Sequence, residues 1–286
     1  MQSPAFAGAS KSRALAPAQP TWRWPFSSRP RTRLASGTTA LHPPPHPRCN
    51  NHPWSSPVTY EGEVLPFAHT AEAVRAWVHG WSASRGAAEP VPSAWGFTVD
   101  VGLHGHVMRH VLHSADEATV HEITQHATAP GVWLKAFVPP EALEPWLAPG
   151  WHLAGGSGYL MSASLPITPT RAPGPLPEGY QMNTWTRDGV TRALVRTADG
   201  AFAARGQVAV TGHSAVVDQV ETDPAHQRRG LGRLVMHRLT EAAAEQGAAA
   251  GVLGATPEGR SLYETTGWRV LAPLTSALRG PDAADT

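Results

Sequence analysis

The sequence predicts an α+β protein with two domains, each a mixed central sheet flanked by helices. Segments of strand periodicity alternate with amphipathic helical segments along residues 61–165 and again along residues 180–278. A proline-rich segment, PITPTRAPGPLPEG, separates the two stretches. The chain has 286 residues, 41% of them hydrophobic, which is enough for two modest cores. We therefore expect domains at residues 59–165 and 177–286, joined by a linker at 166–176.

The first 60 residues have a composition unlike the rest of the chain. They contain no Asp or Glu, seven Lys or Arg, and 11 of the 28 prolines. Such a segment cannot bury enough apolar surface to fold, so residues 1–58 are predicted to form a disordered tail. An acid-poor, arginine-rich start also suggests a transit peptide, but the prolines oppose the amphipathic helix that one needs.

Composition excludes several classes of protein. Cys49 is the only cysteine, so no intramolecular disulfide can form, and no apolar run is long enough to span a bilayer. We expect a cytoplasmic protein without a membrane partner. The formal net charge of +1 does not suggest a nucleic-acid partner, although the basic tail leaves that alternative open.

The elements of both domains follow from periodicity and from helix-capping signals. In the first domain we expect a helix at 71–84, strands at 96–101 and 106–112, a helix capped by Ser114 or Asp116, a strand at 132–138, a helix at 140–147 and a strand at 159–165. In the second we expect strands at 180–186, 190–197, 201–210 and 216–222, a helix from 230 to 247, a strand at 251–254 and a helix from 257.

The junction at residues 216–232, VVDQVETDPAHQRRGLG, joins a strand to a helix through a glycine turn. Pro224 cannot donate to a sheet ladder, and Gly230 and Gly232 open the helix. Such a turn leaves backbone N–H groups unpaired at a helix N-terminus, where the helix dipole favours negative charge. The junction therefore suits a pyrophosphate, although it has neither the G-x-G-x-x-G nor the Gly-Lys-Ser/Thr pattern of other phosphate loops.

Three motifs in this half resemble those of the GCN5-related N-acetyltransferase (GNAT) superfamily. The sequence QRRGLG at 227–232 fits the family signature Q/R-x-x-G-x-G/A, and LYETTGW at 262–268 is similar to its L-Y-E-x-x-G-F/W element. The hairpin with the turn Ala198-Asp199-Gly200 precedes them, as in that family. The resemblance covers residues 180–278 and implies an N-acetyltransferase that uses acetyl-CoA and a primary amine of a small molecule or peptide.

The resemblance also implies roles for individual residues. Tyr263 matches the tyrosine that gives a proton to the departing thiolate. Asp218 is our first candidate for the base that takes the proton of the amine, with Glu221 and a water chain as alternatives; strand alternation predicts that these two carboxylates lie on opposite faces. The residues expected to contact acetyl-CoA are Val220, Thr222, Gln227, Arg228, Arg229, Gly230, Leu231, Gly232, Arg233 and Thr256.

The first domain is interpreted as a diverged copy of the second. At an offset of 117, five residues of the first half (Pro140, Glu141, Trp146, Gly150 and Trp151) align with Pro257, Glu258, Tyr263, Gly267 and Trp268. The segment aligned with the glycine turn has no glycine, and Trp146 stands where the second copy has Tyr263. We therefore expect a degenerate GNAT-like domain that neither binds the cofactor nor donates a proton.

The second domain departs from the family at its start. The family usually inserts two helices between its first two strands to enclose the acceptor, whereas here residues 180–186 lead almost directly to 190–197. We expect the first domain to complete the acceptor wall, through residues 71–84 or 104–113. Residues 177–286 alone should then bind acetyl-CoA but acetylate poorly.

Two further interpretations concern clusters of side chains in the first domain. His104, His106, His110 and His113 have no matching set of carboxylates or cysteines, so a polar strand face is favoured over a metal site. The tryptophans of this half are interpreted as core residues. For the whole chain, the alternative to an enzyme is a module that holds acyl-CoA as a regulatory ligand without turnover.

Overall fold

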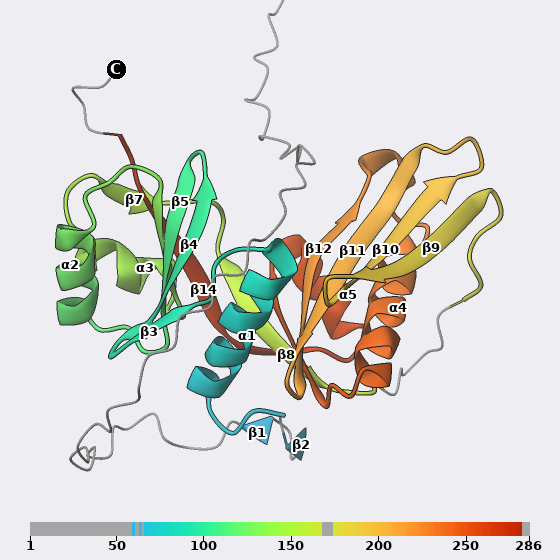
Figure 1. The fold of residues 1–286 in the computed structure, drawn as a ribbon, viewed down its shortest axis with the longest axis horizontal. Helices are drawn as coiled ribbons and strands as arrows, with labels where there is room; N and C mark the ends of the chain where they lie inside the picture. The colour runs from blue at the N-terminus through green and yellow to red at the C-terminus, as the bar shows by residue number, and fades with distance from the viewer. Residues whose placement is uncertain (1–58, 61–62, 65, 168–173, 282–286) are drawn as a thin grey trace, which may run out of the picture. The chain divides into compact units, whose positions relative to one another are not determined.

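The computed structural model describes residues 59–60, 63–64, 66–167 and 174–281 (Figure 1). The predicted tail and most of the predicted linker lie outside these residues. Within them the fold is mixed α/β, as the sequence predicts. None of the described helices combines the length and the apolar character that crossing a membrane requires.

The first half contains short strands, two longer helices and one long hairpin. In chain order its elements are β1 (Thr59–Tyr60), β2 (Glu63–Val64), α1 (Thr70–Arg85), β3 (Val91–Ser93), β4 (Gly96–Leu103), β5 (His106–Leu112), α2 (Glu117–His126), β6 (Val132–Ala136), α3 (Pro140–Leu143), η1 (Glu144–Trp146), β7 (Trp151–Leu153) and β8 (Gly158–Ser164). Asp116 caps α2 by accepting from the backbone N–H of Thr119 at 2.9 Å. The α-helix predicted at 140–147 ends at Leu143, because Pro145 has no N–H to continue it.

The second half contains longer strands and two helices. Its elements are β9 (Tyr180–Arg187), β10 (Val190–Thr197), β11 (Phe202–Thr211), β12 (Ser214–Thr222), η2 (Pro224–His226), α4 (Leu231–Glu245), β13 (Ala250–Ala255), α5 (Pro257–Glu264) and β14 (Arg269–Arg279). Strands β9 and β10 meet at the turn Asp188-Gly189, where both residues have positive φ. This tight hairpin leaves no room for helices between the two strands.

One sheet runs through both halves in the order β3-β4-β5-β6-β14-β8-β13-β12-β11-β10-β9, and β7 pairs with β14 at its side (Figure 1). Two neighbouring pairs are parallel, β5 with β6 and β12 with β13, and the others are antiparallel. A helix connects each parallel pair, α2 in the first half and α4 in the second. The two halves therefore contain the same strand–helix–strand unit.

The halves exchange strands where they meet. β8, from the first half, lies between β13 and β14, with Met161 opposite Leu253 on one side and Val270 on the other. The end of β14, from the second half, lies between β6 and β7, with Ala277 opposite both Leu134 and Leu153. The two predicted domains thus share one sheet, and each half completes the sheet of the other.

The segments aligned at the offset of 117 have the same local conformation. Pro140 and Pro257 each open a helix after a strand. Gly150 and Gly267 have φ angles of 84° and 91°, and each precedes a buried tryptophan. The two halves thus share one backbone conformation at these positions, and the internal repeat stays a prediction.

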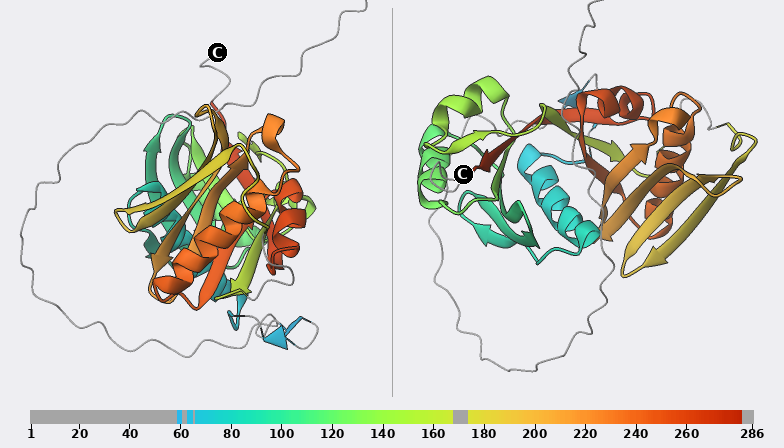
Figure 2. Two further views of the ribbon diagram at one scale, coloured as in Figure 1. Left: turned by 90° about the vertical axis from the view of Figure 1, so that its right-hand side faces the viewer. Right: turned by 90° about the horizontal axis from the view of Figure 1, so that it is seen from above.

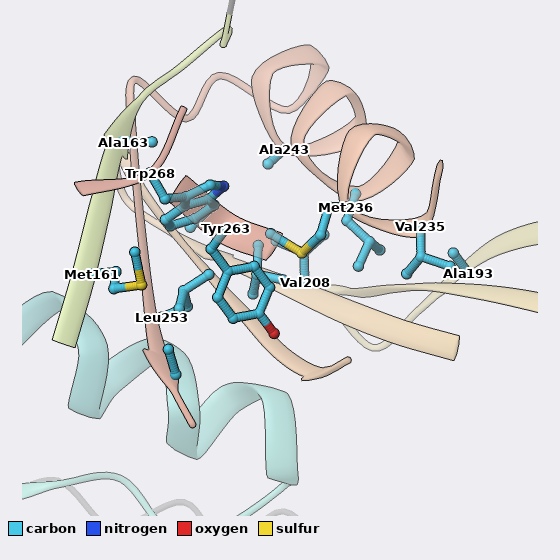
Figure 3. Close-up of a cluster of buried hydrophobic side chains, with 14 of the residues drawn as sticks. Met161, Ala163, Ala193, Val208, Val235, Met236, Ala243, Leu253, Tyr263 and Trp268 are labelled. Carbon is cyan, nitrogen blue, oxygen red and sulfur yellow. The ribbon is translucent and has the colours of Figure 1, made fainter. Parts of the chain in front are cut away.

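Three groups of buried apolar residues hold the sheet and helices together. One lies within the first half around α2, and a second packs α4 and α5 on the sheet of the second half (Figure 3). The third is formed by α1, which contributes Trp77, Trp81 and its neighbours to a core with Val111 of β5 and Val216 of β12. Helix α1 therefore packs against strands of both halves (Figures 1 and 2).

Helices α1 and α4 cover opposite faces of β12. Val216 packs in the core around α1, whereas the next residue, Val217, packs in the core around α4. The second half has no helices between β9 and β10, and α1 covers the face of its sheet that lies opposite α4. This packing agrees with the expectation that residues 71–84 lie against the second domain.

Candidate functional site

The glycine turn lies between the end of β12 and the start of α4. Gly230 is the N-cap of α4 with a φ of 79°, and Arg228 also has a positive φ of 63°. A Cβ at Gly230 would meet no atom within 4 Å, so the backbone conformation requires glycine while the space around it is open. The turn is exposed from Gln227 to Gly230.

The start of α4 presents its backbone N–H groups without a side-chain cap. Leu234 N–H makes the first helical bond to the carbonyl of Gly230 at 3.1 Å, and Gly230 has no side chain to accept from the N–H groups before it. Leu231 is 1% exposed and fixes the start of the helix in the core. The arrangement is that of an anion-binding helix N-terminus.

The polar side chains around the turn differ in whether they form hydrogen bonds within the protein. Gln227 donates to the carbonyl of Thr222 at 3.4 Å, so its amide holds the turn. Arg228 and Arg229 are exposed, and Arg233 donates to the hydroxyl of Thr265 at 3.4 Å. Arg228 and Arg229 are therefore the side chains most accessible to an anion.

Strand β12 contains a bulge that strand periodicity did not predict. The register with β11 changes between Gln207↔Asp218 and Arg205↔Glu221, and Gln219 has a φ of 54°. One extra residue of β12 is therefore left out of the ladder at Gln219 and Val220. The signal in the sequence is the spacing of Val217 and Val220, which are three residues apart yet pack in the same core.

Beyond the bulge, β12 has lost its neighbour on the other side. Its pairing with β13 ends at Val216↔Val252, and the pairs found among the described residues include none between β13 and residues 217–222. The backbone groups on that edge of β12 are thus left for another partner. Gly232, at the start of α4, packs close to this region, since its Cβ would lie 3.5 Å from the hydroxyl of Thr222.

The bulge corrects the prediction that Asp218 and Glu221 lie on opposite faces. Val217 and Val220 both face the core around α4, so the residue after each of them faces the other side, toward α1. Both oxygens of Asp218 accept from Arg85, Oδ2 from Nε and Oδ1 from Nη2 at 2.9 Å. Glu221 is half exposed and forms an ion pair with Arg205 at 2.9 Å.

The first half supplies a polar contact to this face that the sequence did not suggest. Ser84 donates to Asp218 Oδ2 at 3.1 Å, and Gln207 donates to both the carbonyl and the hydroxyl of Ser84 at 2.7 Å. With Arg85, these residues join the last turn of α1 to β11 and β12. No local signal identifies them, because their partners are more than 120 residues away in the sequence.

Tyr263 lies on α5 with its ring in the core of the second half, next to Leu253 and Met236 (Figure 3). The side chain is 8% exposed, and no described residue forms a hydrogen bond with its hydroxyl. Burial, and secondarily the charge of Asp218, raise its pKa to about 12. The hydroxyl is therefore protonated at neutral pH, and its O–H is not already donated to a described residue.

Thr256 occupies the N-cap of α5. Its hydroxyl oxygen accepts from the backbone N–H of Gly259 at 3.1 Å. The O–H itself remains available as a donor. The residue that the sequence assigned to ligand contact thus also stabilises the helix that carries Tyr263.

The histidines at 104, 106, 110 and 113 make different contacts from one another. Residues 66–167 and 174–281 contain no group of three or more His, Cys, Asp or Glu side chains that could hold a metal ion. His110 shares a hydrogen bond with the hydroxyl of Thr98 at 3.0 Å, whereas His106 packs against Trp133 and Trp81. Of the tryptophans interpreted as core, Trp77, Trp81 and Trp151 are buried, and Trp95, Trp133 and Trp146 are partly buried.

Comparison with known proteins finds a matching family model and similar solved structures. The family model described as an acetyltransferase (GNAT) domain matches residues 180–277. A comparison with curated proteins gives no match. Among solved structures, a GCN5-related N-acetyltransferase from Kribbella flavida is 20% identical, with a TM-score of 0.54 over 76% of this chain and 98% of its own.

Two further solved structures are similar at lower scores. One is described as an acetyltransferase from the GNAT family from Novosphingobium aromaticivorans, at 19% identity and a TM-score of 0.46, covering 74% of this chain and 97% of its own. The other is a GCN5-related N-acetyltransferase from Sphaerobacter thermophilus, at 13% identity and a TM-score of 0.47, covering 78% and 97%.

The match of the family model agrees with the glycine turn and with the position of Tyr263 on α5. It begins at the first residue of β9 and ends within β14. The fold shared with the Kribbella flavida protein extends the likeness to the mixed sheet. Residues 180–277 of this chain are therefore similar to the acetyltransferase (GNAT) domain, and the chain shares its fold with the Kribbella flavida protein.

Proposed function

We propose that this domain transfers the acetyl group of acetyl-CoA to a primary amine of a small molecule or peptide. The observation that carries the proposal is the exposed, uncapped N-terminus of α4 at Gly230, beside the open edge of β12. A pyrophosphate at this turn accepts from several N–H groups and meets the positive end of the helix dipole. Arg228, Arg229 and Arg233 add positive charge around it.

The bulge gives the rest of acetyl-CoA a place to bind. An extended pantetheine arm pairs with the free backbone groups of Val220 and Thr222, where β13 no longer does. A backbone N–H beside the bulge then polarises the thioester carbonyl, as a preorganised donor does for a developing oxyanion. Thr256, which directly follows β13, offers its O–H to the same pantetheine arm.

The chemistry requires one proton to leave the amine and one to reach the sulfur. The C–S bond of the thioester breaks as the C–N bond forms, and the departing thiolate takes a proton from the hydroxyl of Tyr263. With a pKa of about 12, Tyr263 is protonated and able to do this at neutral pH. The proton that the nitrogen loses as the amide forms balances the one that Tyr263 gives to the sulfur. A lysine-like amine is protonated at that pH, so it must also lose a proton before it attacks.

Water carries that proton away from the amine. Asp218 accepts from Arg85 and Ser84, and Glu221 accepts from Arg205, so neither carboxylate is a free base held against the reacting nitrogen. Both lie on the face of β12 that α1 covers, where a water chain can pass the proton to either. This assignment keeps Asp218 and Glu221 as terminal acceptors and not as direct ones.

The same ion pairs favour the second candidate function, an acyl-CoA-binding module without turnover. A site that needs only to hold acyl-CoA has no use for a base, and the glycine turn serves both functions equally. The hydroxyl of Tyr263, which has no described partner, supports the enzyme, because a merely structural tyrosine usually satisfies its O–H.

Calorimetry and thiol release separate these functions. The full chain should bind acetyl-CoA and release CoA when an amine panel of aminoglycosides, polyamines, amino acids and peptides is supplied. Tight binding with no release on any amine, and no slow hydrolysis, would establish the binding module instead. We propose the cytoplasm as the site of the reaction.

A further inference from the structure

A group of basic side chains lies against the last turns of α1, on the face of the sheet that carries Asp218. Arg85 ends α1, Arg109 lies on β5 and Lys135 lies on β6; we call these three residues the cationic cluster. The carboxylate among them is Asp218, which interacts with both Arg85 and Arg109. Three basic groups thus share one acidic group.

Arg109 is the least satisfied member of the cationic cluster. Its side chain is 7% exposed, and its guanidinium lies 3.7 Å from the centre of the Trp81 ring. Nε donates to Nε2 of His106 at 3.3 Å, whereas no described residue accepts a hydrogen bond from either of its terminal nitrogens. Burial, together with the charge of Arg85, lowers its pKa to about 9.

The neighbours of Arg109 respond to the excess of positive charge. Burial, and secondarily Arg109, hold the pKa of Lys135 well below its usual range, and its Nζ donates to the hydroxyl of Ser276 at 2.5 Å. The same two causes lower the pKa of His106 to about 3, so His106 is neutral. The lowered pKa values favour the neutral forms of His106 and Lys135, and neither group supplies a negative charge to balance that of Arg109.

Asp218 does not supply the missing acceptor. Both of its oxygens are held by Arg85, and Ser84 donates to one of them. The terminal nitrogens of Arg109 are not among the fully buried polar atoms without a partner, so these N–H groups reach solvent and can donate to an arriving anion. The electrostatics of the cluster thus favour one added negative charge.

The cationic cluster adjoins the proposed site of acetyl transfer. Asp218 is the residue before the bulge of β12, and its charge acts on Tyr263 as well as on Arg109. A ligand that contacts Arg109 from this side is therefore close to the parted strands. The walls of the cluster come from both halves of the chain.

We propose that Arg109, with Arg85 beside it, binds the carboxylate of the acceptor, so that the substrate is an amine that also carries a carboxylate, such as an amino acid or a short peptide. This inference rests on the proposed function. The planar guanidinium offers two parallel N–H groups that fit a carboxylate, and stacking on Trp81 fixes its orientation. Trp133 packs against His106 and lies 4.8 Å from Nζ of Lys135, so its ring belongs to the same group of side chains.

Matched acceptor pairs test the proposal on the full chain. Each pair differs only in its acid group: β-alanine and β-alaninamide, or a dipeptide and its C-terminal amide, with O-phosphoethanolamine as a phosphate arm. The wild type should prefer the carboxylate by at least tenfold in kcat/KM. In Arg109→Gln that kcat/KM should fall by roughly 10–100-fold while the amide is unaffected, as expected for the loss of a charged hydrogen-bonding partner.

Two further variants control for folding. Arg75→Gln removes an arginine of α1 that lies over the Phe97 ring, away from the cluster, and should leave the preference unchanged. Arg109→Lys keeps the charge but not the planar fork, and should retain part of the preference. If Arg109→Gln does not fold, the Arg109→Lys result decides: an unaltered preference would overturn the proposal.

A binding measurement separates this inference from the proposed function. Trp81 and Trp133 contribute to the fluorescence of the chain's 11 tryptophans. N-acetylglycine should therefore change this fluorescence with a half-saturation concentration at least tenfold lower than that of N-acetylglycinamide. That result with no turnover of any amine would reject the enzyme but retain the carboxylate site. Equal response to acid and amide, or a preference for O-phosphoethanolamine over β-alanine, would reject the carboxylate site alone.

Discussion

Gly230 meets two requirements at one position, a left-handed backbone conformation and an empty space in front of the helix. The surrounding residues differ in what the sequence could predict. The signature at 227–232 identified the turn and its exposed arginines, since a short motif carries its own local geometry. It could not predict that Gln227 donates to the carbonyl of Thr222, because that contact depends on packing.

Gly230→Ala should weaken acetyl-CoA binding at least tenfold. The added methyl group enters the space proposed for the pyrophosphate and strains a residue with a φ of 79°. Gly247→Ala is the matched control, because Gly247 has a φ of 90°, has equally open surroundings and follows the other end of α4. Calorimetry that shows the same affinity loss in both variants would assign the effect to strain and not to the ligand.

Tyr263→Phe should lower the rate of CoA release by roughly 10–100-fold with little change in acetyl-CoA affinity, as expected for the loss of a general acid. The pKa of about 12 also fixes the pH dependence. Below that pH the hydroxyl keeps its proton. The wild-type rate should therefore rise between pH 7 and 10 as the amine deprotonates, and deprotonation of Tyr263 should not lower the rate in this range. Full activity in the variant would return Tyr263 to a packing role.

At the scale of elements, the predicted helices and strands of the second half are largely those observed. Two features escaped prediction for the same reason. The bulge in β12 and the arrival of α1 beside it are long-range events, and a period-2 pattern contains no information about an extra residue that a distant helix accommodates. The predicted faces of Asp218 and Glu221 were wrong in consequence. The missing helices led to the prediction that residues 71–84 or 104–113 cover the second half, and α1 is the element that packs on β11 and β12.

The ion pair of Arg85 with Asp218 should contribute to the docking of α1. The pair is largely shielded from solvent, so a double-mutant cycle with Arg85→Gln and Asp218→Asn should give a coupling free energy of roughly 1–2 kcal/mol in unfolding. The exposed pair of Arg205 with Glu221 is the control, with a coupling expected below about 0.5 kcal/mol. Urea unfolding provides the measurement, and equal coupling in the two pairs would mean that burial adds nothing.

At the scale of the whole molecule, the sequence indicated two similar halves but not that they share a sheet. The apolar run of β8 looks the same whether it completes its own half or the other, since strand patterning specifies the faces and not the partner. The domain limits at 165 and 177 therefore stay a prediction from the sequence. In the fold, the segment just before that boundary belongs to the sheet of the second half.

The shared sheet changes what an isolated second half should do. Residues 177–286 alone lack β8, so β13 and β14 would expose unpaired edges in place of their common neighbour. We expect that fragment to unfold without a cooperative transition and to bind acetyl-CoA at least tenfold more weakly than the full chain. The sequence alone had suggested that the fragment still binds acetyl-CoA. Circular dichroism and calorimetry test this expectation. A fragment with a sharp transition and full affinity would show that β8 is dispensable.

The exchange of strands also sets an order of events during synthesis. The end of β14 lies between β6 and β7, although roughly 120 residues are translated between β7 and that strand. The first half therefore emerges from the ribosome with an unfilled position in its sheet, and it must wait for nearly the whole chain. A nascent chain of this kind depends on late closure, so chaperones that shield strand edges should bind it for longer than they bind a protein whose halves mature one after the other.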